Sequence, residues 1–77
     1  VRGAAAYALG RLGDRRAFKW LIMALKDPAA WVRQSAVRGL GLLGDRRAQK
    51  PIEELLFDAD VEVATAAQEA LTALMER

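Results

Sequence analysis

The sequence has no cysteine and no histidine among its 77 residues. The lack of cysteine excludes disulfide bonds and thiolate chemistry, which is compatible with a reducing compartment, and we expect a cytoplasmic protein. The lack of histidine removes the commonest general base and the commonest metal ligand. We therefore expect no catalytic residue, no metal site and no cofactor.

Prolines and aromatic residues are also scarce, with two prolines and 6% aromatic residues. No apolar run approaches the roughly 18 residues that a membrane span needs, and no signal-peptide pattern is present. A chain of this length is near the lower limit for one stable core. We expect a single small domain, residues 1–77, without membrane contact.

Charge is distributed unevenly, although the net charge is only +2. Residues 1–50 carry eleven lysines and arginines against three aspartates, a balance of +8. Residues 51–77 carry one arginine against seven acidic residues, a balance of −6. The folded chain should therefore have a basic end and an acidic end, which bears on its association with partners.

The first 62 residues contain one pattern twice. Residues 1–31 and 32–62 align without a gap and share fourteen identities, and an incomplete third copy begins at Val63. Self-similarity at a fixed period of this size is typical of solenoids. We therefore divide the domain into repeat units 1–31 and 32–62 and a partial C-terminal capping unit, 63–77.

Apolar residues follow a helical spacing in each unit, which predicts an all-α fold. Gly13 and Gly44 should end helices in the left-handed conformation, and Asp14, Asp45 and Asp27 should cap the helices that follow. Five helices are predicted, at about 1–12, 15–26, 28–43, 46–57 and 59–76. The shared core positions are Val1, Ala5, Leu9 and Leu12, then Val32, Ala36, Leu40 and Leu43, then Val63, Ala67, Leu71 and Leu74.

Three positions inside the predicted helices are unusual. Pro51 predicts that the fourth helix starts late or kinks. Gly10 and Gly41 occupy one repeat position, with Ala70 nearby in the third copy, although an interior glycine costs about 1 kcal/mol relative to alanine. We interpret these small residues as places where neighbouring helices approach closely.

The pattern V-R-x-x-A-x-x-x-L-G-x-L-G-D-x-R-A, followed by an L-x-x-A-L-x-D helix, resembles the HEAT-like repeats of phycobilisome lyases and the artificial proteins built from their consensus. This resemblance covers essentially the whole chain. It implies a short right-handed α-solenoid of helical hairpins with a 31-residue period, whose Val-Arg helices line a concave, partner-binding side. It also implies a ladder of turn aspartates and arginines, which Asp27 and Arg33 fit. Asp58 is followed by Ala64 at the arginine position, so the ladder is expected to fail there.

Enzymatic activity is not expected. The hydroxyl nucleophiles, such as Ser35 and Thr65, have no histidine to activate them. The metal-dependent HEAT-repeat hydroxylases, which the predicted fold resembles, depend on His-Glu pairs that this sequence lacks.

Function is expected where the repeat is not kept. The stripe opposite the shared core face changes from Tyr7 to Arg38 to Glu69. Core residues of a solenoid must repeat because their neighbours repeat, so a stripe that varies is free to recognise a partner. We predict a non-catalytic protein–protein interaction scaffold with the partner-binding residues Tyr7, Trp31, Gln34, Ser35 and Arg38. The alternative is a solvent-facing stripe without function, with Trp31 folded back on its own turn.

The two GDRR turns carry an alternative function. Arg15, Arg16, Arg46 and Arg47 recur at the repeat period and predict basic clusters that bind nucleic acid or another anion. Arg16 and Arg47 match the arginine that pairs with acidic turn residues in the resembled family, and few aromatic residues are interleaved, so nucleic acid is the less favoured partner. The family also suggests a second alternative, a non-catalytic part in a bilin-lyase-like complex.

Two further surfaces remain open. The sequence begins in mid-solenoid, without a recognisable N-terminal cap, so we expect self-association, either as a closed dimer or head to tail, with the basic end against the acidic end. Phe18, Ile22 and Met23 form a second apolar patch that the next unit does not repeat. Two explanations of this patch are open: packing between helices, or contact with a partner.

Overall fold

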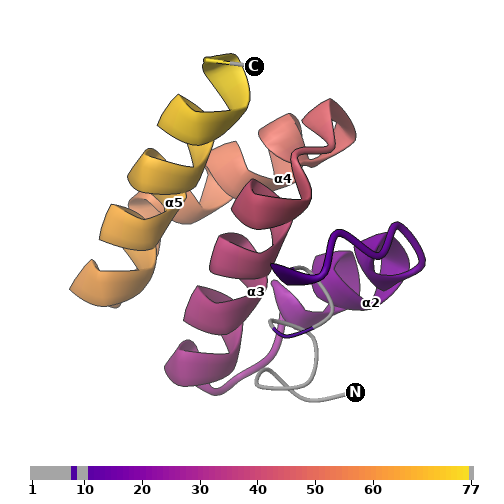
Figure 1. Ribbon diagram of the computed structural model, residues 1–77. Coiled ribbons are helices and arrows are strands. Elements are labelled where there is room, and N and C mark those ends of the chain that lie inside the picture. Colours follow the sequence, from indigo (N-terminus) through magenta and orange to yellow (C-terminus); the bar gives the residue numbers. More distant parts are fainter. Residues whose placement is uncertain (1–7, 9–10, 77) are drawn as a thin grey trace.

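Two layers of helices form the part of the chain that the computed structural model describes, residues 8 and 11–76 (Figure 1). The α-helices are α2, Ala17–Ala24; α3, Ala30–Leu43; α4, Gln49–Glu54; and α5, Val61–Met75. Two 3₁₀ turns, Arg46–Ala48 and Leu55–Phe57, flank α4. No strand occurs among these residues, which confirms the all-α prediction.

Helices α3 and α5 lie side by side and run in the same direction, with α2 and α4 behind them (Figure 1). A hollow of about 280 Å³ separates α2 from α4 in the rear layer. The Cα atoms extend over 29 × 28 × 15 Å. The short dimension matches two helix layers, because packed helices lie about 8–10 Å apart and the Cα radius of each is about 2.3 Å.

The first predicted helix, residues 1–12, lies largely outside the described residues. Ala8 and Arg11 are helical, and the Leu12 amide donates to the Ala8 carbonyl at 3.1 Å. Tyr7 is not among the described residues.

The predicted stop signal Gly44 and start signal Asp45 act as expected, whereas Asp14 is not the N-cap of α2, because Arg16 occupies that position. Gly44 ends α3 with φ 75°, and its amide donates to the Leu40 carbonyl at 3.1 Å. Asp45 caps the next turn by accepting from the Arg47 amide at 3.0 Å. Asp60 caps α5 by accepting from the amides of Glu62 and Val63. Local hydrogen bonds therefore determine these helix boundaries.

The start of α3 differs from the prediction by two residues. Asp27 is not the N-cap; its carboxylate accepts from the Ala29 amide at 2.9 Å, and Ala29 caps a helix that begins at Ala30. This side-chain turn holds Pro28 in an irregular segment before the helix, because an aspartate that bonds the amide two residues on imitates a backbone turn.

Pro51 explains why the fourth helix starts late, as predicted. Residues 46–48 form a 3₁₀ turn, and α4 begins only at Gln49. Pro51 is then the third residue of α4. Amides in the first helical turn have no intrahelical partner, so the missing N–H of proline costs nothing there.

Most of the predicted core is buried between the two layers. The fully or almost fully buried residues include Ala17, Leu21, Val32, Ala36, Leu40, Ala48, Ile52, Val63, Ala67 and Leu74. Leu12, which the repeat places among the shared core positions, is exposed, and so is Leu56 of the fourth predicted helix. Leu12 is 81% exposed because it lies in the turn that leads to Gly13, and Leu56 is exposed because α4 ends before it, in a 3₁₀ turn that changes the direction of its side chain.

The second apolar patch divides between packing and surface. Phe18 and Ile22 pack against the buried core, whereas Met23 is exposed. The Arg47 guanidinium lies over the Phe18 ring, 4.4 Å from its centroid. This cation–π contact joins the first GDRR helix to the second GDRR turn.

Candidate functional site

A groove runs along the exposed boundary between α3 and α5. It includes a hollow of about 320 Å³ above three small, buried residues, Gly41, Ala66 and Ala70. The remaining lining residues are Arg38, Leu42, Glu69 and Ala73. We call this feature the α3–α5 groove.

The floor of the groove is shaped by a close approach of the two helices. A Cβ atom added to Gly41 would lie 3.2 Å from the Ala70 Cβ, which is tighter than ordinary van der Waals contact. The glycine therefore lets α3 approach α5 at this level. This confirms the interpretation of Gly41 and Ala70 as residues that permit helix approach.

A second hollow extends the groove toward the starts of both helices. It measures about 230 Å³ and shares Arg38, Ala66 and Glu69 with the first. Its other lining residues are Gln34, Val61, Glu62 and Thr65. The two hollows together follow α5 from residue 61 to residue 73, which is about 18 Å of helix at 1.5 Å per residue.

The two walls of the groove carry opposite charge. Arg38 lines the α3 side, and Glu62 and Glu69 line the α5 side. Within residues 8 and 11–76, none of these three side chains takes part in an ion pair or a side-chain hydrogen bond. Their charges are therefore available to a molecule that enters the groove.

The predicted partner-binding residues do not all reach the groove. Gln34 and Arg38 line it, and Trp31 is 54% exposed near the start of α3 without lining either hollow. Ser35 is half-buried and lines neither hollow. The prediction for Tyr7 lies outside the described residues.

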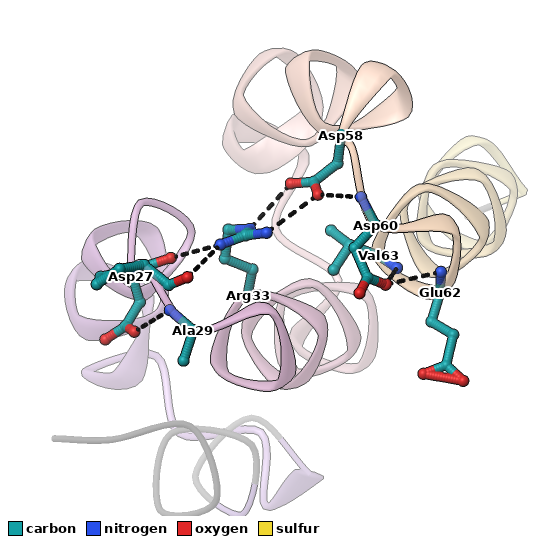
Figure 2. Close-up of polar contacts among 8 residues, drawn as sticks. Asp27, Ala29, Arg33, Asp58, Asp60, Glu62 and Val63 are labelled. Carbon is teal, nitrogen blue, oxygen red and sulfur yellow. Dashed lines mark hydrogen bonds and ion pairs between the residues drawn. The ribbon is translucent and has the colours of Figure 1, made fainter.

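Arg33 joins the two turns that precede α3 and α5 (Figure 2). Its Nε and Nη2 atoms donate to the Asp58 carboxylate at 2.9 and 3.1 Å, and its Nη1 atom donates to the carbonyls of Asp27 and Pro28 at 2.8 and 3.0 Å. Asp58 also accepts from the Asp60 amide at 2.9 Å. The expectation that the ladder fails at Asp58 is therefore wrong. The Arg33 guanidinium pairs with Asp58, in the turn before α5, and also donates to the carbonyls of the turn before α3.

This arrangement fixes the groove. The pKa of the Asp58 carboxyl lies below its ordinary value, chiefly because the Arg33 side chain donates to it and further because the Asp60 amide does. The ion pair ties the chain before α3 to the chain before α5, so it sets the relative position of the helices that form the two walls (Figure 2).

The two GDRR turns have matching hydrogen bonds. The Asp14 carboxylate accepts from the Arg16 amide at 2.9 Å and from its guanidinium at 3.1 and 3.0 Å. The Asp45 carboxylate accepts likewise from the Arg47 amide at 3.0 Å and from its guanidinium, at 2.7 Å for Nη2. The pKa of each aspartate is lowered, first by the arginine side chain.

These bonds partly neutralise the basic turns. Arg16 and Arg47 are each held by the aspartate of their own turn, as the structural interpretation of these arginines expects. Arg15 acts on the second turn, since its charge contributes to the low pKa of Asp45. A hollow of about 340 Å³ brings the predicted anion-binding residues Arg46 and Arg47 beside Lys50, together with Gln49 and Glu53.

Two negative findings concern only the described part of the chain. No three acidic residues there lie close enough together to hold a metal ion. No helix there combines the length and the apolar character needed to cross a membrane.

The variable stripe in the sequence includes Glu69, but the predicted partner-binding set contains no residue of α5 and none of the floor residues. The sequence therefore did not predict that Glu62 and Glu69 form the wall opposite Arg38. The signal that connects them to Arg38 was already present in the repeat alignment, because equivalent helices of successive units are expected to lie side by side.

Comparison with known proteins agrees with the repeat pattern. A family model described as HEAT repeats matches residues 1–72. A search of curated proteins gave no match.

Proposed function

Because the chain belongs to the HEAT-repeat family, we propose that it is a non-catalytic scaffold that binds a protein partner in the α3–α5 groove. HEAT repeats generally mediate protein–protein interactions. The observation that carries the proposal is that the groove is lined by side chains that vary between the units. Arg38 of the second unit and Glu69 of the third unit occupy equivalent positions and face one hollow.

The composition of the groove supports this function. Leu42 is 48% exposed on its edge, and Trp31 lies exposed near the start of α3. Tryptophan and arginine are enriched among the residues that contribute most to protein binding, and small floor residues admit a side chain from a partner. The groove lies on the face of α3 and α5, which we infer to be the concave side of the solenoid.

Photo-crosslinking tests this function. The full chain carries a photoreactive residue either at Leu42, on the groove edge, or at Lys19, exposed on α2 in the other layer. Covalent capture of a protein partner is expected from position 42 and not from position 19. An Arg38→Glu substitution should abolish the capture. Capture from position 19 alone would refute binding in the groove.

We also propose the larger architecture that the repeat implies. The chain forms one domain, with units 1–31 and 32–62 and a partial capping unit 63–77, stacked as a right-handed solenoid with a 31-residue period. The matching bonds of the two GDRR turns support this division, since Asp14 and Asp45 stand 31 residues apart.

Anion or nucleic-acid binding is the second candidate, and the basic hollow beside Lys50 is the observation in its favour. Binding of a polyanion should weaken steeply between about 50 and 200 mM salt. The double substitution Arg15→Ala, Arg46→Ala should remove it. Binding that survives this substitution would eliminate the second candidate, as would binding that is insensitive to salt.

Self-association is proposed as well. Two apolar side chains outside the groove are largely exposed: Phe57, before α5, and Met75, at its end. They lie in the acidic segment of the chain, and exposed apolar surface of this kind favours association.

A further inference from the structure

The α3–α5 groove has a chemistry that selects one class of partner, and the inference drawn from it rests on the proposed function. The floor contains only small residues, Gly41, Ala66 and Ala70, and one hollow above it measures about 320 Å³. A floor of this kind offers apolar contact and leaves space that the described residues do not fill. It suits a large apolar side chain that a partner supplies.

The length of the groove favours a helix as the occupant. The lining residues follow α5 over about 18 Å, which is the length of about 12 helical residues. A helix lying along α3 and α5 would place an apolar stripe on the floor and its two flanks against the two walls. Recognition of an amphipathic helix in a groove uses this arrangement.

The walls determine the charges on that helix. Glu62 and Glu69 stand seven residues apart on α5, which is about 10 Å, or two helical turns. Two cations seven residues apart on one flank of a partner helix match this spacing. Arg38 on the opposite wall calls for one acidic residue on the other flank.

We propose that the partner segment is an amphipathic helix with an apolar stripe, two basic residues seven positions apart on the flank that faces α5, and an acidic residue on the flank that faces α3. The three groove charges have no partner within residues 8 and 11–76, so a helix with this pattern pairs them without breaking an existing bond. A helix with the opposite pattern places like charges against each other on both walls.

Two synthetic peptides of about 14 residues test the proposal. The first has a leucine stripe, two lysines seven positions apart on one flank and a glutamate on the other. The second is identical except that each charge is reversed. Each is titrated at low salt into the full ¹⁵N-labelled chain, and the amide resonances are followed by NMR.

The first peptide should bind about tenfold more tightly than the second, because the second places like charges opposite three partly exposed groove charges. The shifted amides should lie within residues 34–42 and 61–73. Glu69→Lys should weaken the first peptide and strengthen the second. Glu76→Lys makes the same charge change beyond the groove and should leave both affinities unchanged; circular dichroism checks that both variants remain folded.

Equal affinity of the two peptides, binding outside the groove, or absence of binding would overturn the proposal. Groove resonances that shift on dilution of the protein alone would also overturn it, because the occupant would then be a second copy. If a partner is crosslinked from position 42 while the charge-reversed peptide is preferred, the proposed function stands and this inference fails. If nothing is captured from position 42, the proposed function itself fails.

Discussion

Arg33 binds the carboxylate of Asp58 through two nitrogen atoms, although 25 residues separate them in the sequence (Figure 2). The third nitrogen of the same guanidinium donates hydrogen bonds to the carbonyls of Asp27 and Pro28. The Asp58 side chain is only 8% exposed. One planar guanidinium therefore joins the equivalent turns of two successive units, and the position of the groove walls depends on it.

Loss of the paired bonds between Arg33 and Asp58 should destabilise the protein. Arg33→Met leaves the Asp58 carboxylate without its cation and should lower the urea midpoint clearly. Arg33→Lys should lower it less, because an ammonium keeps the charge but cannot match the carboxylate with two parallel bonds. Arg38→Met changes an arginine of the same helix that has no ion pair with any described residue; it serves as the control and should change the midpoint little. Equal urea midpoints for Arg33→Met and Arg38→Met would contradict a stabilising role of the Arg33–Asp58 ion pair.

Acid should destabilise the fold, with the loss concentrated at low pH. The pKa values of Asp14, Asp45 and Asp58 lie below their ordinary value, chiefly because arginine side chains donate to them. The unfolded chain, in which an aspartate pKa is about 3.9, then binds more protons than the folded one below about pH 5. Stability is therefore full above this range and is lost as the pH falls through the folded pKa values.

Urea denaturation at pH 3, 4, 5 and 7 measures this dependence. The midpoint should be nearly constant from about pH 7 to 5 and should fall steeply below about pH 4. Asp58→Asn should be less stable at pH 7 and should show a shallower acid decline. An unchanged midpoint at pH 3 would show that these ion pairs do not contribute.

The two glycine sites should respond differently to alanine. Gly13 has φ 74° and nothing within 4 Å of an added Cβ, so Gly13→Ala isolates the left-handed backbone cost of about 1–2 kcal/mol. Gly41→Ala gains about 1 kcal/mol of helix propensity but places a Cβ against Ala70. It should therefore be tolerated better, while Gly41→Leu should force α3 away from α5. Thermal denaturation measures all three, and greater stability of Gly13→Ala than the parent would contradict the turn geometry.

Alanine substitutions at Leu40 and Leu42 distinguish a core residue from a groove residue of the same helix. Leu40 is fully buried, and Leu40→Ala should cost about 2–5 kcal/mol, enough to unfold much of so small a domain. Leu42 lies on the groove edge, and Leu42→Ala should change stability by only about 0.5 kcal/mol. Partner binding should be weakened by the Leu42 variant while its urea midpoint is unchanged. A large loss of stability in that variant would place Leu42 in the core.

Self-association is testable by light scattering over a concentration series. The mass should rise with concentration, and the double substitution Phe57→Ser, Met75→Ser should suppress the rise by removing exposed apolar surface. Met23→Ser removes an exposed methionine on α2 and should have no effect. A monomer at every concentration would contradict the proposal.

Local rules in the sequence predicted the helices because their causes are local. Gly44 ends α3 through its own φ angle, Asp45 caps the next turn through the amide two residues away, and Pro51 delays α4 through its missing N–H. The repeated core spacing likewise predicted that Val32, Leu40 and Val63 are buried. Each of these interactions joins residues within one or two helical turns or depends on a periodic pattern.

The sequence by itself therefore determined the helical class, the repeat and most of the core. Only the tertiary structure decided that Asp58 pairs with Arg33, that Leu12 is exposed, and that Arg38 and Glu69 share one groove. Each of these depends on how segments far apart in the sequence are placed, or on where a helix stops relative to its neighbour. Local hydrogen bonding determines the elements, whereas packing between the units determines which charges meet and which remain available to a partner.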